Sequence, residues 1–191
     1  TNRIVGAGPK ENRKPMDFYP TPPDVTQALL DELFLPTMFT VWEPACGKGD
    51  MADVITENGY KCVRTDLAYG EDFLTMEPPE YDFIITNPPF SKAEEFIRRA
   101  WELGKPFAFL LKSQYWHAAR RYELFKEMPP MWIFPLTWRP DFCGGGSPLM
   151  DVMWCVWNPL EEKYTVASKY MPLQRPKGEH KCQKRSRYAQ S

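Results

Sequence analysis

Short apolar runs alternate along the chain with segments of helical spacing, which is the pattern of an α/β fold. The runs 41–43, 61–65, 82–86 and 106–111 are too short for helices and predict buried strands. Apolar positions three and four residues apart predict helices over 22–35, 93–101 and 115–128, and a further helix that begins at residue 51. The runs 131–137 and 152–157 predict a final antiparallel pair. We therefore expect a mostly parallel sheet with an antiparallel C-terminal strand.

The first predicted helix has closely spaced start signals. Thr21 is placed as the N-cap, Pro22 as the first helical residue, and Asp24 closes a capping box. Taken alone, these residues predict only a well-capped helix. Free N–H groups beside a threonine hydroxyl would also suit a carboxylate ligand.

A glycine loop follows the first predicted strand, with the sequence Glu43-Pro44-Ala45-Cys46-Gly47-Lys48-Gly49-Asp50. A strand enters this loop and a helix leaves it, as at the nucleotide-binding start of a doubly wound sheet. Gly47 and Gly49 allow a tight turn and the close approach of a ligand. Lys48 is not followed by Ser or Thr and the P-loop spacing is missing, so a Walker-type ATP site is disfavoured.

The second predicted strand ends at Asp66, where an acidic side chain would hold a ribose diol. A solvated aspartate is the alternative, but its distance from the glycine loop favours the ribose. The stretch 70–74 is predicted as a truncated third strand, which places Asp72 and Phe73 near the base of the same ligand.

The strand over 82–86 ends in the corner Asn87-Pro88-Pro89-Phe90. Prolines lack an N–H, so the corner offers acceptors without a competing donor. If the Asn87 side-chain oxygen and the Pro88 carbonyl each accept one N–H of a planar amino group, the nitrogen lone pair turns toward an electrophile. Phe90 supplies a flat surface for a planar substrate. The alternative is a turn that merely terminates the strand.

Composition limits the partners and the compartment. The 191 residues suit one domain, and a net charge of −1 means that nucleic-acid contacts require local basic patches. We expect a flexible basic segment over 1–16, a catalytic domain over 17–171 and a disordered basic tail over 172–191. The odd, scattered cysteines indicate a reducing, cytoplasmic compartment, and no run reaches transmembrane length. No metal site is expected, because His180 and Cys182 are too few ligands.

Together these motifs resemble those of S-adenosylmethionine-dependent amino-methyltransferases, especially small phage or prophage DNA N6-adenine methyltransferases. The resemblance rests on the loop 43–49, Asp66 and the corner 87–90 in that order, and on the leading Phe-Tyr-Pro-Thr-Pro-Pro of 18–23. It covers about 17–157. It implies a Rossmann-like class I methyltransferase fold, S-adenosyl-L-methionine as cofactor, and double-stranded DNA as partner in a bacterial or phage-infected cell.

The resemblance also implies a role for each matched residue. The corner Asn87, Pro88, Pro89 and Phe90 would receive a flipped adenine. The residues that would contact the cofactor are Tyr19, Thr21, Glu43, Pro44, Ala45, Cys46, Gly47, Gly49, Asp66, Leu67, Asp72 and Phe73. In the long loop 138–148, Trp138 or Phe142 would cover the other face of the base, and Arg139 would help to read the target.

The chain departs from the family in one respect, since it has no room for a target-recognition domain after the glycine loop or after the catalytic domain. Readout would then fall to the loop 139–148, the basic ends, or a second subunit or homodimer. Three alternatives remain open. They are an RNA amino-methyltransferase acting on guanine N2 or adenine N6, a protein glutamine methyltransferase, which more often has Tyr where this chain has Phe90, and a catalytically idle DNA-binding subunit.

Overall fold

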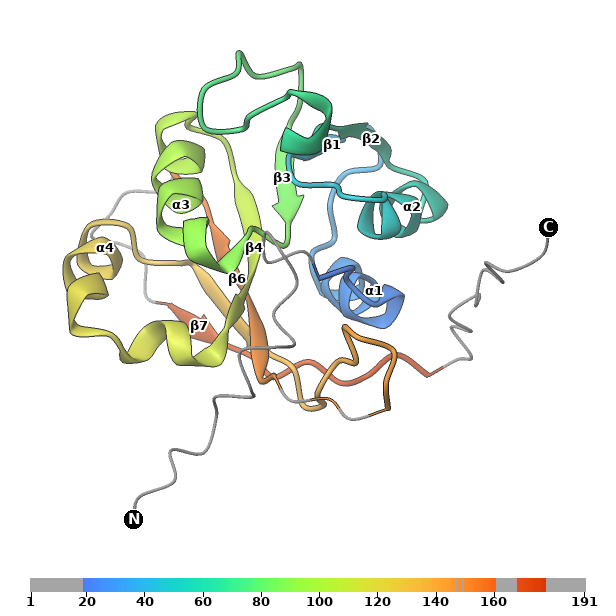
Figure 1. The fold of residues 1–191 in the computed structure, drawn as a ribbon, viewed down its shortest axis with the longest axis vertical. Helices are drawn as coiled ribbons and strands as arrows, with labels where there is room; N and C mark the ends of the chain where they lie inside the picture. The colour runs from blue at the N-terminus through green and yellow to red at the C-terminus, as the bar shows by residue number, and fades with distance from the viewer. Residues whose placement is uncertain (1–18, 147, 149, 161–167, 178–191) are drawn as a thin grey trace, which may run out of the picture.

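The computed structural model describes residues 19–146, 148, 150–160 and 168–177 (Figure 1). Its centre is a seven-stranded sheet with the order β2-β1-β3-β4-β6-β5-β7. The strands are β1 (Thr40–Glu43), β2 (Lys61–Arg64), β3 (Phe83–Thr86), β4 (Phe107–Lys112), β5 (Trp132–Pro135), β6 (Val152–Trp157) and β7 (Lys169–Tyr170). Strands β2, β1, β3 and β4 are parallel, and β6 is antiparallel to both of its neighbours. The predicted α/β architecture is confirmed.

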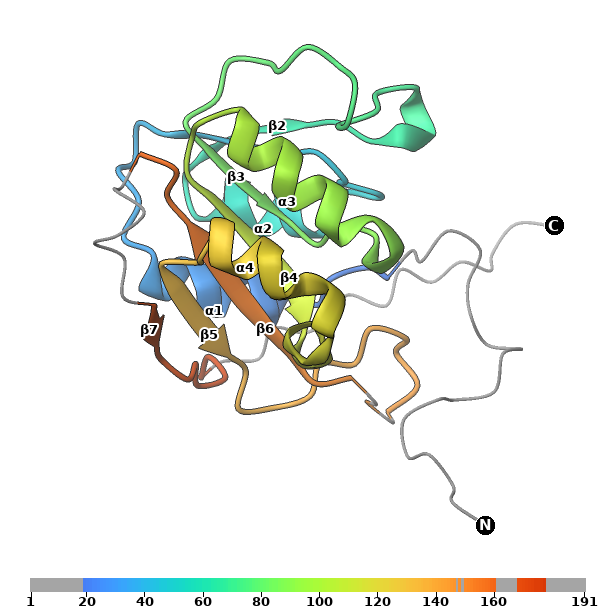
Figure 2. The same cartoon turned by 90° about the vertical axis from the view of Figure 1, so that its left-hand side faces the viewer.

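Helices cover both faces of the sheet. Helices α1 (Pro23–Glu32) and α2 (Asp50–Glu57) pack on one face, and α3 (Ala93–Glu102) and α4 (Tyr122–Glu127) pack on the other, as Figure 2 shows. Side chains alternate along each strand, so Trp154 of β6 enters the core beneath α1 while Trp157 enters the core beneath α3. Burial on both faces explains why these strands are continuous apolar runs.

Helix α1 is fixed to the sheet by a buried hydrogen bond, in which Trp154 Nε1 donates to the Val25 carbonyl at 3.0 Å. The chain stays on this body beyond residue 172, because Leu173 is buried and Arg175 Nε donates to Asp24 Oδ2 at 2.7 Å. The expectations for segments 1–16 and 178–191 lie outside the described residues.

The predicted start of α1 is wrong by one residue. Pro22 is the N-cap with ψ 142°, so Thr21 lies outside the helix. The reason is the following Pro23, which excludes the helical conformation at Pro22 and so moves the helix start forward. Asp24 accepts from Arg175 rather than closing a capping box.

Two further predictions of local structure are wrong. Residues 70–74 form turns, not a strand, because the Asp72 carbonyl accepts the N–H groups of Thr75 and Met76. The predicted helix 115–128 is divided into the 3₁₀ turns 113–117 and 119–121 and the short helix α4, with Ala118 extended between the turns. Strand β7, which pairs in parallel with β5, was not predicted from the sequence.

Across the described ranges, no helix is both long and apolar enough to cross a bilayer. The cysteines in those ranges are all unbridged: Cys46, Cys62, Cys143 and Cys155.

Candidate active site

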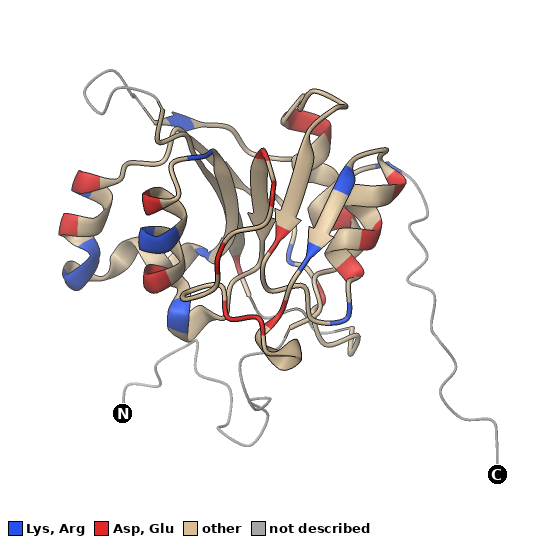
Figure 3. Cartoon of the chain, turned by 90° about the horizontal axis from the view of Figure 1, so that it is seen from above, with Lys and Arg blue, Asp and Glu red and all other residues tan. Residues whose placement is uncertain are grey.

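The predicted site residues gather where the parallel strands end. The carboxyl ends of β1, β2, β3 and β4 meet at one edge of the sheet, which is the ligand-binding edge of open α/β folds. Acidic residues, red in Figure 3, follow the strand arrowheads at this edge. A cavity of about 620 Å³ opens there.

Most of the residues predicted to bind a cofactor line this cavity. They are Tyr19, Thr21, Glu43, Pro44, Ala45, Cys46, Gly47, Asp66, Leu67, Asp72 and Phe73. Gly49 does not, since it is the N-cap of α2 with φ 88°. A Cβ on Gly49 would lie 2.9 Å from Arg64 Nη1, so this glycine shapes the turn instead of facing the ligand.

Asp66 joins two walls of the cavity. Its Oδ2 accepts the Gly47 N–H at 2.7 Å, and its Oδ1 accepts the Ala68 N–H at 2.8 Å. A carboxylate has about four lone-pair sites, so two acceptor sites remain for ligand hydroxyls. The hydroxyl of Tyr69 donates to the Gly47 carbonyl at 3.1 Å and extends the same wall.

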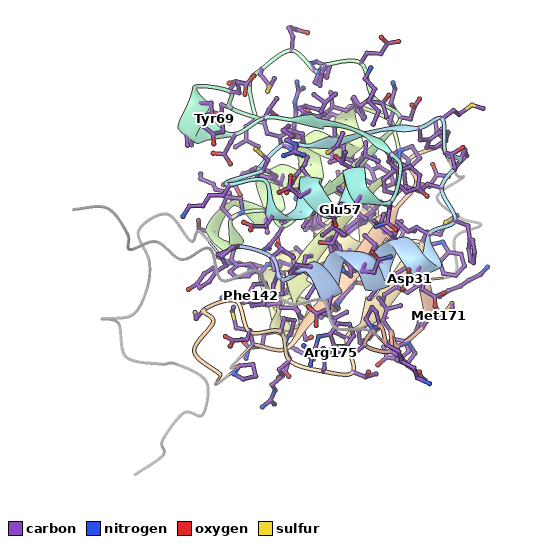
Figure 4. All side chains as sticks on the ribbon, turned by 90° about the vertical axis from the view of Figure 1, so that its right-hand side faces the viewer. Asp31, Glu57, Tyr69, Phe142, Met171 and Arg175 are labelled. Atoms are coloured by element: carbon purple, nitrogen blue, oxygen red, sulfur yellow. The ribbon has the colours of Figure 1, made fainter. Side chains whose placement is uncertain are left out.

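Figure 4 places Tyr69 and Phe142 at one side of the molecule, with Asp31 and Met171 at the other.

Glu43, the last residue of β1, is 3 % exposed, and its Oε2 has no hydrogen-bond partner. Burial raises the pKa of its carboxyl from 4.5 to about 8, and the Ala52 amide and Arg64 oppose this shift only in part. Glu43 is one of the residues that line the cavity. A cationic ligand group beside Glu43 would favour its ionised form, so the site suits a ligand that carries positive charge at this point.

An aromatic wall closes the cavity beside Asp72. Phe73 is buried and packs 5.2 Å from Trp42 and 4.7 Å from Phe96, measured between ring centroids. Asp72 Oδ1 accepts the Leu74 N–H at 3.0 Å, which fixes the turn that carries both residues. A flat apolar wall next to an acidic group suits a heteroaromatic ring with amino groups.

The Asn87 amide has a fixed environment. Its Nδ2 donates to Thr21 Oγ1 at 3.1 Å and points to the Tyr19 carbonyl at 3.4 Å. Its Oδ1 is buried without a hydrogen-bond partner, and Asn87 lines the cavity. A buried acceptor without a partner carries a desolvation cost of about 1–3 kcal/mol, which a ligand N–H would remove. The side chain is therefore built to accept.

The residues around this corner form an aromatic contact. Phe90 lies 5.8 Å from Tyr19 between ring centroids, and Lys112 Nζ lies 4.0 Å from the Phe90 centroid. The Phe90 surface predicted for base stacking is thus shared with a lysine ammonium. Pro89 lines the cavity, whereas Pro88 and Phe90 are not among its lining residues.

The three residues of the long loop do not line the cavity. Phe142 is 4 % exposed and packs edge-on against Tyr19 at 6.3 Å, so it supports the site from behind. Trp138 is half-buried against the core beneath α1. Arg139 is exposed and donates to Asp151 at 2.7 Å. Neither Trp138 nor Phe142 lines this cavity, and their role in covering the base stays a prediction.

Several lining residues were not predicted from the sequence: Pro20, Lys48, Asp50, Met51, Ala68, Tyr69, Ser91, Lys92 and Phe96. Most of them lie within a few residues of a predicted motif. Residues 50–51 open α2 directly after the glycine loop, and 91–92 follow the Asn87 corner. Extending each motif by one helical turn would have found these four. Phe96 reaches the cavity only through the packing of α3 on Phe73, which no local signal indicates.

No family model and no curated protein sequence matches this chain. Solved structures do. A Listeria monocytogenes protein assigned to the class I S-adenosylmethionine-dependent methyltransferases matches with a TM-score of 0.58 and 12% identity, over 85% of this chain and 68% of that one.

Two other solved structures have similar scores. The methyltransferase subunit of a type I restriction-modification system from Streptococcus thermophilus has a TM-score of 0.55 and 12% identity, over 78% of this chain and 46% of its own. A dimethyladenosine transferase from Plasmodium falciparum has a TM-score of 0.54 and 11% identity, over 73% of this chain and 62% of its own. The present chain thus has the Rossmann-like fold of class I methyltransferases.

Proposed function

We propose that this protein is a methyltransferase that uses S-adenosylmethionine to methylate the exocyclic N6 amino group of adenine in DNA. One observation carries the proposal. The Asn87 amide oxygen is buried and without a partner beside a cavity that the glycine loop and Asp66 also line.

The cavity fits the proposed cofactor. S-adenosylmethionine, when bound, supplies an electrophilic methyl group on a positively charged sulfur. Asp66 retains acceptor sites for the ribose diol, and the Phe73 wall with Asp72 suits the adenine ring. The unpartnered carboxyl oxygen of Glu43 suits the positively charged part of the molecule.

The corner supplies the groups that a planar amine requires. An exocyclic amine is a poor nucleophile because its lone pair is delocalised into the ring. Asn87 Oδ1 and the Pro88 carbonyl would each accept one N–H, so the nitrogen becomes tetrahedral and its lone pair is directed away from the ring. As the new N–C bond forms and the bond from the methyl group to sulfur breaks, the nitrogen gains positive charge. The same two acceptors would stabilise this charge until one N–H proton passes to water. Positioned acceptors therefore take the place of a strong base.

The choice of DNA draws on two kinds of support. The order of motifs from the glycine loop to Asn-Pro-Pro-Phe is that of DNA adenine methyltransferases, and the Streptococcus relative in fold belongs to a restriction-modification system. RNA is the second candidate, since the Plasmodium relative in fold is named for adenosine, which is a ribonucleoside. This chain spans about half the length of the restriction-modification subunit, which makes a recognition partner part of the proposal.

A transfer assay tests the function. Protein is incubated with S-adenosylmethionine labelled in its methyl group and with unmethylated double-stranded DNA, RNA or bulk protein, and nucleosides of each nucleic-acid product are analysed. N6-methyladenine in DNA is expected. Label in RNA alone would show that the substrate is RNA instead of DNA. Cofactor binding without any transfer would favour an idle subunit or a missing partner. The variant Asn87→Ala is the negative control, because contaminating enzymes retain their activity in its preparations.

A further inference from the structure

We infer that Thr21 is a positioning residue that fixes which way the Asn87 amide faces, so that its oxygen rather than its nitrogen meets the substrate. The inference rests on the proposed function for its kinetic consequence, but the orientation itself is a property of the protein without ligand. It assigns Thr21 a role that differs from capping α1 and from simple contact with a cofactor.

The first step concerns the acceptors around the amide. An asparagine amide has one accepting and one donating end, and a rotation by 180° exchanges them. Beside Asn87 lie the Thr21 hydroxyl at 3.1 Å and the Tyr19 carbonyl at 3.4 Å. The carbonyl only accepts, so the NH₂ end must face these two groups and Oδ1 must face away from them. Segment 19–21 thereby selects the accepting orientation.

The second step compares the strengths of the two hydrogen bonds from Asn87 Nδ2. A donor–acceptor distance of 3.4 Å is beyond the usual 2.7–3.2 Å of such bonds, so the Tyr19 contact is the weaker one. The Thr21 contact is in range, and Thr21 is 6 % exposed, so little water competes for it. Removing the Thr21 oxygen would leave only the weak contact, and the two amide orientations would approach equal energy.

The third step concerns rigidity. Thr21 stands between Pro20 and Pro22, whose rings fix φ on both sides and hold the segment extended. The helix that follows is tied to the sheet by the bond from Trp154 to Val25. The Thr21 hydroxyl therefore lies on a rigid segment of backbone, and this rigidity lets it hold the Asn87 amide in one orientation.

Thr21 also lines the cavity. Its oxygen accepts from Asn87, while its own O–H remains a donor. The hydroxyl is placed to donate to an anionic ligand group without releasing the amide.

Two substitutions separate the positioning role from a structural one. Thr21→Val keeps the shape but removes the acceptor, and Thr21→Ser keeps the acceptor. Thr26→Val is the matched control, since Thr26 is a buried threonine in the following helix whose Oγ1 has no partner. The first readout is the NMR signal of the Asn87 side-chain NH₂ in the cofactor-free protein, assigned by its loss in Asn87→Asp. Thr21→Val is expected to shift this signal, and Thr21→Ser and Thr26→Val to preserve it.

The second readout is kinetic. Loss of one ordinary hydrogen bond corresponds to about tenfold, so Thr21→Val is expected to lower kcat by about that factor, with Thr21→Ser restoring most of it. Affinity for S-adenosylhomocysteine is measured on the same preparations. The positioning role acts on the substrate amine, so it predicts that kcat falls at saturating cofactor, whatever the Thr21 O–H contributes to cofactor affinity. An unmoved NH₂ signal in Thr21→Val would overturn the inference, as would a loss confined to cofactor affinity. If the wild-type protein transfers no methyl group, the proposed function fails, and the NMR result still decides the role of Thr21.

Discussion

The backbone N–H of Gly47 donates to the Asp66 carboxylate at 2.7 Å, which joins the turn after β1 to the turn after β2. The N–H of Ala68 donates to the other carboxylate oxygen at 2.8 Å. A single side chain thus shapes the glycine loop and presents acceptors to the cavity. Asp66 therefore fixes the geometry of the glycine loop, and in the proposed function it also accepts hydrogen bonds from the ribose.

Asp66→Ala is expected to weaken the binding of S-adenosylhomocysteine at least about tenfold. The substitution removes the acceptors for the ribose and releases the Gly47 turn, and hydrogen bonds to a charged group are worth about 1.5–3 kcal/mol each. Isothermal titration calorimetry measures the change. Asp31→Ala is the control, since Asp31 lies at the other side of the molecule from Tyr69 in Figure 4. An unchanged affinity in Asp66→Ala would refute the ribose assignment.

Asn87→Ala is expected to abolish methyl transfer while leaving cofactor affinity nearly intact. The amide oxygen acts on the substrate amine, and the acceptors assigned to the cofactor lie on Asp66 and Glu43. Transfer rates and S-adenosylhomocysteine affinity are measured on the same preparation. Asn58→Ala, an exposed asparagine after α2, controls for loss of an amide elsewhere. Activity close to wild type in Asn87→Ala would remove the proposed role of the corner.

The sequence was sufficient for those parts of the site that depend on strand ends. Glu43, Asp66 and Asn87 each end a strand or follow one closely, and parallel strands bring their carboxyl ends to the same edge. The hydrophobic pattern and the parallel arrangement of the strands were therefore enough to predict that these three residues lie close together.

The sequence was not sufficient where a side chain had more than one partner to choose from. Threonine is a common N-cap residue, which is why Thr21 was predicted to cap α1. Because Pro23 moves the helix start by one residue, the Thr21 hydroxyl instead accepts a hydrogen bond from Asn87. The sequence likewise contained no sign that Phe142 and Trp138 pack against the core beneath α1. Such choices depend on contacts between residues far apart in the chain, which local patterns do not contain.

Thr26→Val is expected to stabilise the protein by about 1 kcal/mol. Thr26 is fully buried in α1 and its hydroxyl has no hydrogen-bond partner, so replacement by an isosteric methyl group removes a desolvation cost. Urea unfolding at neutral pH measures the change. Thr56→Val provides the contrast, because Thr56 Oγ1 donates to the Ala52 carbonyl at 2.8 Å and its loss brings no gain. Destabilisation by Thr26→Val would mean that the hydroxyl has a partner in solution, such as a bound water.

Glu43→Gln is expected to change how stability depends on pH. Burial raises the pKa of Glu43 to about 8 in the folded protein, against 4.5 for an unperturbed glutamic acid. Between these values the folded state holds a proton that the unfolded state has lost, so the stability of the wild type falls as pH rises from about 4.5 to about 8 and levels off above that. Each pKa unit is worth about 1.4 kcal/mol, which makes the total fall several kcal/mol.

The amide that replaces the Glu43 carboxyl in this variant would be neutral at every pH, so this contribution disappears. The difference in unfolding free energy between Glu43→Gln and the wild type is expected to grow in favour of the variant from about pH 5 to about pH 8. Urea unfolding of both cofactor-free proteins across this range measures it, and the titration of other groups cancels in the difference. A constant difference would show that the carboxyl is already ionised at the acidic end of the range, and that its environment holds a compensating charge in the absence of ligand. A growing difference would establish a protonated Glu43 in the empty site, from which a cationic ligand group must displace a proton when it binds.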